Sequence, residues 1–371
     1  MKKTILSCIA ALCCVSAFAQ DEQGSGFTID LDVIGRIDAV GEFPLGTGAK
    51  PSYNSGNSVV YTKLESSFAE YFNLVWAAHW ANTGEEQIPF YTTPDLYRNT
   101  LLTDCTDWTD IFYIDFTMQG FNFRIGKDCL ALGGFDYEAW DWDVDFATAS
   151  SFWLNNASYQ WGAQVGYTTP DESSSFTFQV QSSPFTYMSC SDAQTQYPWV
   201  NGIGTYSLKY TGEYGPIYTS NSYNFIQSNN WGSGVSKGLH ILALGVMGNF
   251  LDCASVGVEW ASRSDDGSAF CSQTHQVDML ASWEINDFVS LEGKIGWEKI
   301  ASAHEMDFYG AAPYDRLWGG ITANVFPIPG NKDLRVMATV AGANTRVQGL
   351  AANSMSATLG IIYNHTFQLK K

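Results

Sequence analysis

Basic residues are scarce in this 371-residue chain, which holds 19 Lys and Arg against 38 Asp and Glu. The resulting formal charge of −19 at pH 7 repels the phosphates of nucleic acids and the headgroups of anionic lipids. Nucleic acid is therefore not an expected partner, and bulk selection of anionic solutes is disfavoured as well.

Histidine is also rare, with five residues in the whole chain. His304-Glu305 lacks the second histidine of an H-E-x-x-H motif, and no G-x-S-x-G elbow or glycine-rich phosphate loop occurs. His79 lies on a polar face, but no neighbouring pattern offers it a Ser or Asp partner. We therefore expect no enzyme activity, with no catalytic residue, no cofactor and no bound metal.

Long apolar runs are missing except at the N-terminus. Lys2 and Lys3 precede the apolar stretch 5–15, and Ala17-Phe18-Ala19 follows as a small-x-small cleavage site. This order is typical of a secretory signal peptide, and the stretch is too short to cross a bilayer as a helix. We predict a signal peptide over residues 1–19, followed by a single exported domain over residues 20–371.

What the rest of the chain does contain is alternation of apolar and polar residues with a period of two, the pattern of half-buried strands. The clearest pair is 111–118 and 121–126, with a tight turn at Gln119-Gly120. Only 215–226, with little contrast, and 237–247, apolar on both faces, depart from this pattern. Alternation predicts about sixteen strands, and no linker interrupts the series.

The predicted connections alternate in length, as in outer-membrane barrels. Short turns are expected near 69–70, 119–120, 170–171, 212–213, 248–249, 286–287 and 329–330, and long loops over 43–56, 83–108, 129–156, 184–202, 227–236, 264–273, 300–314 and 346–353. The predicted fold class is all-β: a transmembrane antiparallel β-barrel of about 16 strands, with short periplasmic turns and long extracellular loops.

Charged residues in the middle of strands favour this barrel over a soluble array of β-sandwiches or a propeller. Asp115 and Arg124 lie mid-strand opposite the apolar face, and aromatics such as Trp161 and Trp283 gather toward strand ends, as interfacial girdles do. An even number of strands also lets the sheet close without an edge in lipid.

Loop 129–156 is the candidate for narrowing the lumen, because its segment 135–145 carries five carboxylates and no base. About sixteen strands leave a water-filled lumen, and carboxylates at a narrow point favour cations. The predicted constriction residues are Asp136, Glu138, Asp141, Asp143 and Asp145. The basic residues predicted to face them from the pore wall are Lys63, Arg124, Lys209, Arg316 and Arg335.

Two other interpretations of the acidic segment stay open. It is equally compatible with a solvated outer loop that shields the surface. Asp141, Asp143 and Asp145 also have the D-x-D-x-D spacing of a calcium loop, although Phe146 and Phe152 stand where an EF-hand needs Gly and Glu.

A short motif near this loop adds a family resemblance. Gly126-Lys127, followed by the segment Gly133-Gly134-Phe135-Asp136-Tyr137-Glu138, resembles the G-K…G-G-F/W-x-Y stretch of the phosphate-selective porin O/P family in its Bacteroidota branch. The resemblance implies a sixteen-stranded, trimeric outer-membrane porin with its third long loop folded into the pore. It does not extend to phosphate, because that family lines its pore with Arg and Lys arrays, whereas this third loop is acidic.

The resulting prediction is a porin in the outer membrane of a Gram-negative bacterium, allowing passive diffusion of small hydrophilic solutes or ions. Its expected partners are outer-membrane lipid, those solutes, and two further copies in a homotrimer. The alternatives are an outer-membrane barrel enzyme of the lipase or protease type and a plugged, adhesin-like barrel.

Overall fold

The computed structural model describes most of the chain beyond the predicted signal peptide. The described residues are 28–46, 48–68, 71–82, 109–135, 137–140, 142–154, 159–183, 204–227, 238–251, 253–264, 274–300, 313–347 and 349–370. Residues 1–19 lie outside these ranges, so the signal peptide and the domain boundary at residue 20 stay predictions.

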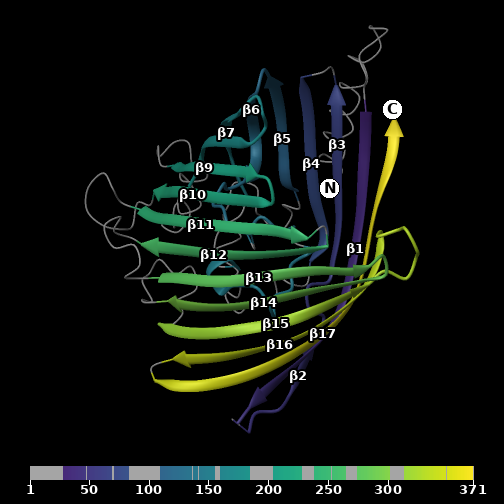
Figure 1. Cartoon of the computed structure of the whole chain (residues 1–371), viewed down its shortest axis with the longest axis vertical. Helices are drawn as coiled ribbons and strands as arrows, with labels where there is room; N and C mark the ends of the chain where they lie inside the picture. Colours follow the sequence, from purple (N-terminus) through teal and green to yellow (C-terminus); the bar gives the residue numbers. More distant parts are fainter. Residues whose placement is uncertain are drawn as a thin grey trace, which may run out of the picture.

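The described chain is almost entirely β-strand (Figure 1). Its elements are β1 (Thr28–Leu45), β2 (Ser52–Asn54), β3 (Val59–Phe68), β4 (Phe72–Asn82), β5 (Thr109–Met118), β6 (Phe121–Cys129), α4 (Ser151–Leu154), β7 (Tyr159–Thr168), β8 (Ser174–Ser182), β9 (Gly204–Tyr214), β10 (Ile217–Gln227), β11 (Gly238–Leu251), β12 (Ala254–Ser264), β13 (Thr274–Asn286), β14 (Val289–Ile300), β15 (Tyr314–Val325), β16 (Leu334–Val347) and β17 (Leu350–Lys370). Within these ranges no helix has the length and apolarity needed to cross a membrane.

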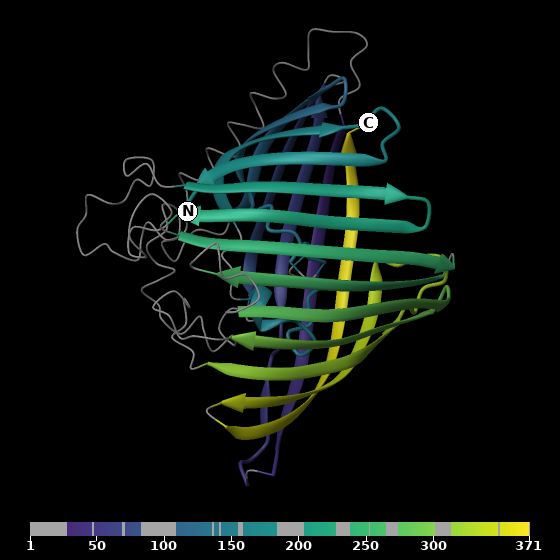
Figure 2. The ribbon, with the colours of Figure 1, turned by 60° about the vertical axis from the view of Figure 1, so that its left-hand side comes forward.

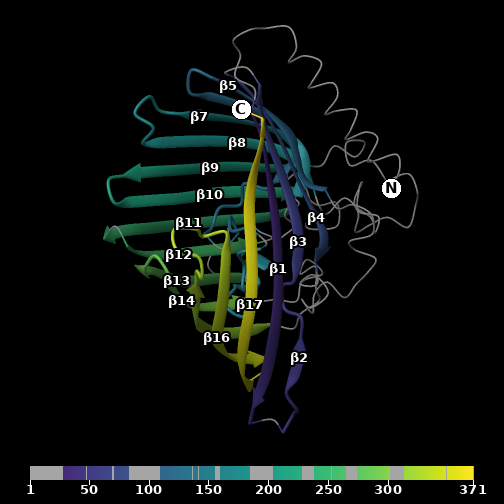
Figure 3. The ribbon, with the colours of Figure 1, turned by 90° about the vertical axis from the view of Figure 1, so that its right-hand side faces the viewer.

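The sixteen long strands close into one barrel. Each pairs antiparallel with the next long strand in the chain, and β17 pairs with β1 from Ile29↔Lys370 to Leu45↔Asn353. Figure 3 shows β17 and β1 side by side at this seam. The three-residue β2 only lengthens the edge of β1, pairing Val40 with Asn54. The predicted antiparallel barrel of 16 strands is therefore confirmed.

Connection lengths follow the predicted alternation with one exception. The turn between β5 and β6 is Gln119-Gly120, as expected, and the connections at that end of the barrel are short. The long loop predicted over 346–353 is wrong, because only residues 348–349 separate β16 from β17. The backbone ladder continues to Val347↔Leu350, although the Ala, Asn and Ser side chains of 351–354 show little apolar contrast.

The two faces of the barrel wall differ in polarity. Outward side chains such as Ile125, Leu317 and Ile321 are apolar and more than half exposed. Inward side chains include Gln179 and Gln276, which are polar and nearly fully buried. An apolar outside around a polar inside is the arrangement of a barrel whose exterior meets lipid.

Candidate functional site: the loop across the lumen

The connection between β6 and β7 turns inward, and its described residues, 130–135, 137–140 and 142–154, are called the inner loop below. Figure 2 shows part of it, in teal, inside the ring of strands. It contacts β1, β3, β8 to β10, β12 and β14 to β16. Since β1 and β10 stand on opposite sides of the closed ring, the inner loop crosses the lumen.

Two glycines start this crossing. Gly133 and Gly134 have φ values of 74° and 91°, in the left-handed region that favours glycine. A Cβ on Gly133 would lie 2.6 Å from Oγ of Ser222, and one on Gly134 would lie 2.5 Å from the Trp153 ring. Ser222 Oγ donates a hydrogen bond to the carbonyl of Leu132. Gly133 thus lets the backbone lie directly against β10, and Gly134 lets it lie against the Trp153 ring of the same loop.

Two buried glutamates hold the inner loop on the same side. Glu259 of β12 is 1% exposed and accepts hydrogen bonds from Trp153 Nε1 and from a backbone N–H of the loop. Glu298 of β14 is fully buried and accepts from Ser150 Oγ at 3.0 Å and from the Phe152 N–H at 3.3 Å. A buried carboxylate is stable only when such donors satisfy it, so both glutamates fix the segment around α4.

The inward face of β11 completes this attachment. Leu239, Ile241 and Ala243 are buried in one apolar cluster with Phe152 and Trp153. Their contact with the inner loop explains why 237–247 is apolar on both faces: one face points outward and the other receives the loop.

Arg36 of β1 holds the middle of the loop. Its Nη1 donates to the carbonyls of Trp142 at 2.9 Å and Val144 at 2.7 Å, while Nη2 pairs with Asp38 at 2.7 Å. Nδ2 of Asn57 donates to the same Val144 carbonyl at 3.2 Å. Both members of the Arg36–Asp38 pair are buried.

Aromatic rings add a second apolar contact near Arg36. The Trp142 ring packs on Tyr61 of β3 with centroids 4.9 Å apart and stacks on Trp140 at 4.7 Å. Nζ of Lys63 lies 5.2 Å from the centroid of the Trp140 ring and 2.6 Å from Oε1 of Glu65.

The other predicted basic residues also lie on the lumen face, and each pairs with an acid. Lys209 pairs with Glu138 and Arg335 with Asp143, which joins loop to wall. Arg316 pairs with Glu298 at 3.1 Å. Arg124 pairs with two acids of the wall, Asp115 at 2.7 Å and Asp128 at 2.5 Å. Arg124 belongs to a network within the wall, and its side-chain hydrogen bonds in the described part of the chain go to Asp115 and Asp128.

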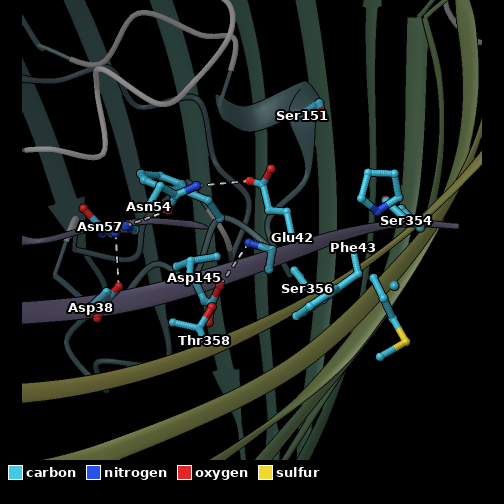
Figure 4. Close-up of a pocket in the computed structure, with 18 of the residues that line it drawn as sticks. Asp38, Glu42, Phe43, Asn54, Asn57, Asp145, Ser151, Ser354, Ser356 and Thr358 are labelled. Carbon is cyan, nitrogen blue, oxygen red and sulfur yellow. Dashed lines mark hydrogen bonds between the residues drawn. The ribbon is translucent and has the colours of Figure 1, made fainter. Parts of the chain in front are cut away.

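A cavity of about 440 Å³ remains between the inner loop and the wall formed by β1, β16 and β17 (Figure 4). Its charged lining residues are Arg36, Asp38, Glu42, Asp145 and Arg316. Ser354, Ser356 and Thr358 of β17 line it with hydroxyl groups. This cavity therefore lies on the side of the lumen opposite the cluster of Phe152 and Trp153.

The structure places the five predicted constriction acids unequally. Asp136 and Asp141 lie outside the described residues. Glu138 and Asp143 are paired with wall bases, and Asp145 lines the cavity. In the part of the chain that the structure describes, no three His, Cys, Asp or Glu side chains gather to hold a metal ion.

Several contributors were missed from the sequence. Glu42 lines the cavity but lies beside the predicted loop 43–56, where the strand pattern stops. Glu259 and Glu298 alternate correctly but carry no local sign of a contact to a distant loop. The expectation that His79 has no acidic partner is wrong, since its Nδ1 lies 2.9 Å from a carboxylate oxygen of Asp110 on the adjacent strand β5.

Comparisons with solved structures show the same architecture. The outer membrane channel DcaP of Acinetobacter baumannii aligns with a TM-score of 0.59 at 12% identity, over 92% of this chain and 98% of that one. The chain has a porin-like fold. A loop-deletion mutant of OmpT, an outer membrane protein of Vibrio cholerae, aligns with a TM-score of 0.55 at 12% identity. The alignment covers 92% of this chain and 100% of that one. A triple mutant of Rhodopseudomonas blastica porin aligns with a TM-score of 0.53 at 13% identity, over 91% of this chain and 100% of that one.

No family model matches the chain, and no curated protein matches it in sequence. The resemblance to the phosphate-selective porin O/P family therefore stays a prediction, and at these identities the structural likeness concerns the fold alone.

Proposed function

We propose that this chain is an outer-membrane porin through which small hydrophilic solutes or ions diffuse passively. The observation that carries the proposal is the cavity beside the inner loop, inside a closed barrel with a polar lumen and an apolar exterior. A barrel of this size encloses an aqueous space, and an inner loop narrows it to a path of limited width. The porins and channel among the structural neighbours support the same activity and an outer-membrane location.

The pairing of the wall bases argues against phosphate as the solute. Lys63, Arg124, Lys209, Arg316 and Arg335 each have an acidic partner, so they do not form an open array for an anion. A trimeric assembly is part of the proposal and is supported by the trimer form of the Vibrio cholerae OmpT neighbour.

Planar-bilayer recording of the purified, folded protein tests the function. The expected result is stable conductance that appears in groups of three equal steps. A barrel that keeps its heat-modifiable mobility on SDS gels but conducts no current would contradict the porin proposal and favour the plugged alternative.

The protein is proposed not to be an enzyme. The described part of the chain holds two His–Asp pairs, His79 with Asp110 and His365 with Asp333, and each would need an activated nucleophile to form a hydrolytic site. The His79–Asp110 pair instead ties β4 to β5 on the lumen face. Esterase and peptidase activity that is lost in a His79→Ala variant would overturn this view.

A further inference from the structure

We infer that Glu42 and Asp145 set the charge preference of the passage beside the inner loop, and that Glu138 and Asp143 of the same loop do not. The inference rests on the proposed porin function and names the residues that decide which ions pass. Glu42 comes from the wall strand β1 and Asp145 from the inner loop, and both line the same cavity (Figure 4).

Two acids of the same loop, Glu138 and Asp143, are already neutralised. Glu138 is bound to Lys209, and Asp143 is bound to Arg335. Each pair has no net charge, so its field falls off within a short distance in water. These acids attach the loop to the wall and contribute little to ion selection.

The other charges of the cavity cancel in the same way. Arg36 and Asp38 form a buried pair at 2.7 Å, and the remaining hydrogen bonds of that guanidinium go to two loop carbonyls. Arg316 pairs with Glu298 at 3.1 Å. Both bases that line the cavity are thus matched by an acid.

Glu42 and Asp145 are left without a basic partner in the described part of the chain. Glu42 accepts neutral hydrogen bonds from Ser52 Oγ at 3.0 Å and Asn54 Nδ2 at 3.3 Å. Oδ1 of Asp145 accepts from the Ala147 N–H at 2.9 Å, and its Oδ2 is buried without a hydrogen-bond partner among the described residues. The cavity therefore carries two uncompensated negative charges.

Two such charges against a low-dielectric wall attract small cations and repel anions. The hydroxyls of Ser354, Ser356 and Thr358 replace part of a cation's hydration without adding charge. The favoured class of solute is accordingly small cations, both inorganic ions and organic ammonium ions.

The test is the K⁺/Cl⁻ permeability ratio, obtained from reversal potentials in a KCl gradient. The double variant Glu42→Gln/Asp145→Asn removes both uncompensated charges with little change of shape. We expect the ratio to fall about threefold or more toward one, with conductance retained. The matched control Glu138→Gln/Lys209→Gln deletes a neutral pair and should leave the ratio unchanged.

An unchanged ratio in the first double variant, or an equal fall in the control, would overturn the inference while leaving the porin function intact. Absence of wild-type conductance would instead overturn the proposed function. If the double variant fails to fold, the single variant Glu42→Gln provides the test, because Glu42 is exposed and its replacement should not prevent folding. A K⁺/Cl⁻ permeability ratio equal to that of wild type would contradict the role given to Glu42.

Discussion

The two sides of the lumen differ in how they receive the inner loop. On the side of β10 to β14, the loop is held by buried carboxylates and by an apolar cluster without exposed side chains. On the side of β1, β16 and β17, it faces a cavity of about 440 Å³ lined by hydroxyls and charges. The loop is attached on both sides, by α4 and its neighbours on the first and by residues 142–144 on the second, and the cavity lies beside the residues that follow, 145–147.

The largest expected effect comes from breaking the packed side. Phe152→Ala removes a fully buried ring from the cluster and should weaken loop docking by about 3–5 kcal/mol. In planar bilayers we expect a larger mean conductance and frequent current fluctuations, with the barrel's heat-modifiable mobility unchanged.

The matched control is Phe146→Ala, a change of the same kind in the same loop but at a residue lining the cavity. It should widen the passage without fluctuations, because that ring is only partly buried. Equal fluctuation in both variants would show that the two sides hold the loop equally.

A smaller effect is expected from Glu298→Gln. The amide keeps the shape but loses the charge that pairs with Arg316. It also loses one of the two acceptor oxygens, Oε1 for Arg316 or Oε2 for both Ser150 and Phe152, which costs about 1–3 kcal/mol. The same current recordings should show rarer fluctuations than in Phe152→Ala.

The control for this change is Glu292→Gln on the same strand. Glu292 accepts a hydrogen bond from Asn324 of the neighbouring strand at 3.0 Å, and among the described residues it has no hydrogen bond or ion pair with the inner loop. Its recordings should match wild type, and fluctuations of the same frequency as in Glu298→Gln would contradict the positioning role of Glu298.

Local alternation was sufficient to predict the barrel wall. Phe121, Phe123 and Ile125 point outward, whereas Asn122 and Arg124 point inward, because side chains of a strand change face at each residue. The same parity placed all five predicted bases on the lumen face.

The partners across the lumen could not be predicted in this way. Arg335 and Asp143 are 192 residues apart, and nothing in either segment encodes the other. The apolar inner face of 237–247 was a local sign of where the loop packs. It could be interpreted only after the structure showed that the loop covers this face. The sequence did not predict the two-residue connection between β16 and β17, because the small and polar residues 351–354 show no alternation of apolar and polar side chains.

Thiol accessibility tests the central contrast most directly. Ser356→Cys places a thiol in the cavity, and Ala243→Cys places one under the loop, on the packed side. Adding a cationic methanethiosulfonate reagent to open channels should reduce the current of Ser356→Cys beyond any change in the parent, and leave that of Ala243→Cys equal to the parent. Block of Ala243→Cys with no effect on Ser356→Cys would show that ions pass on the other side and contradict the account.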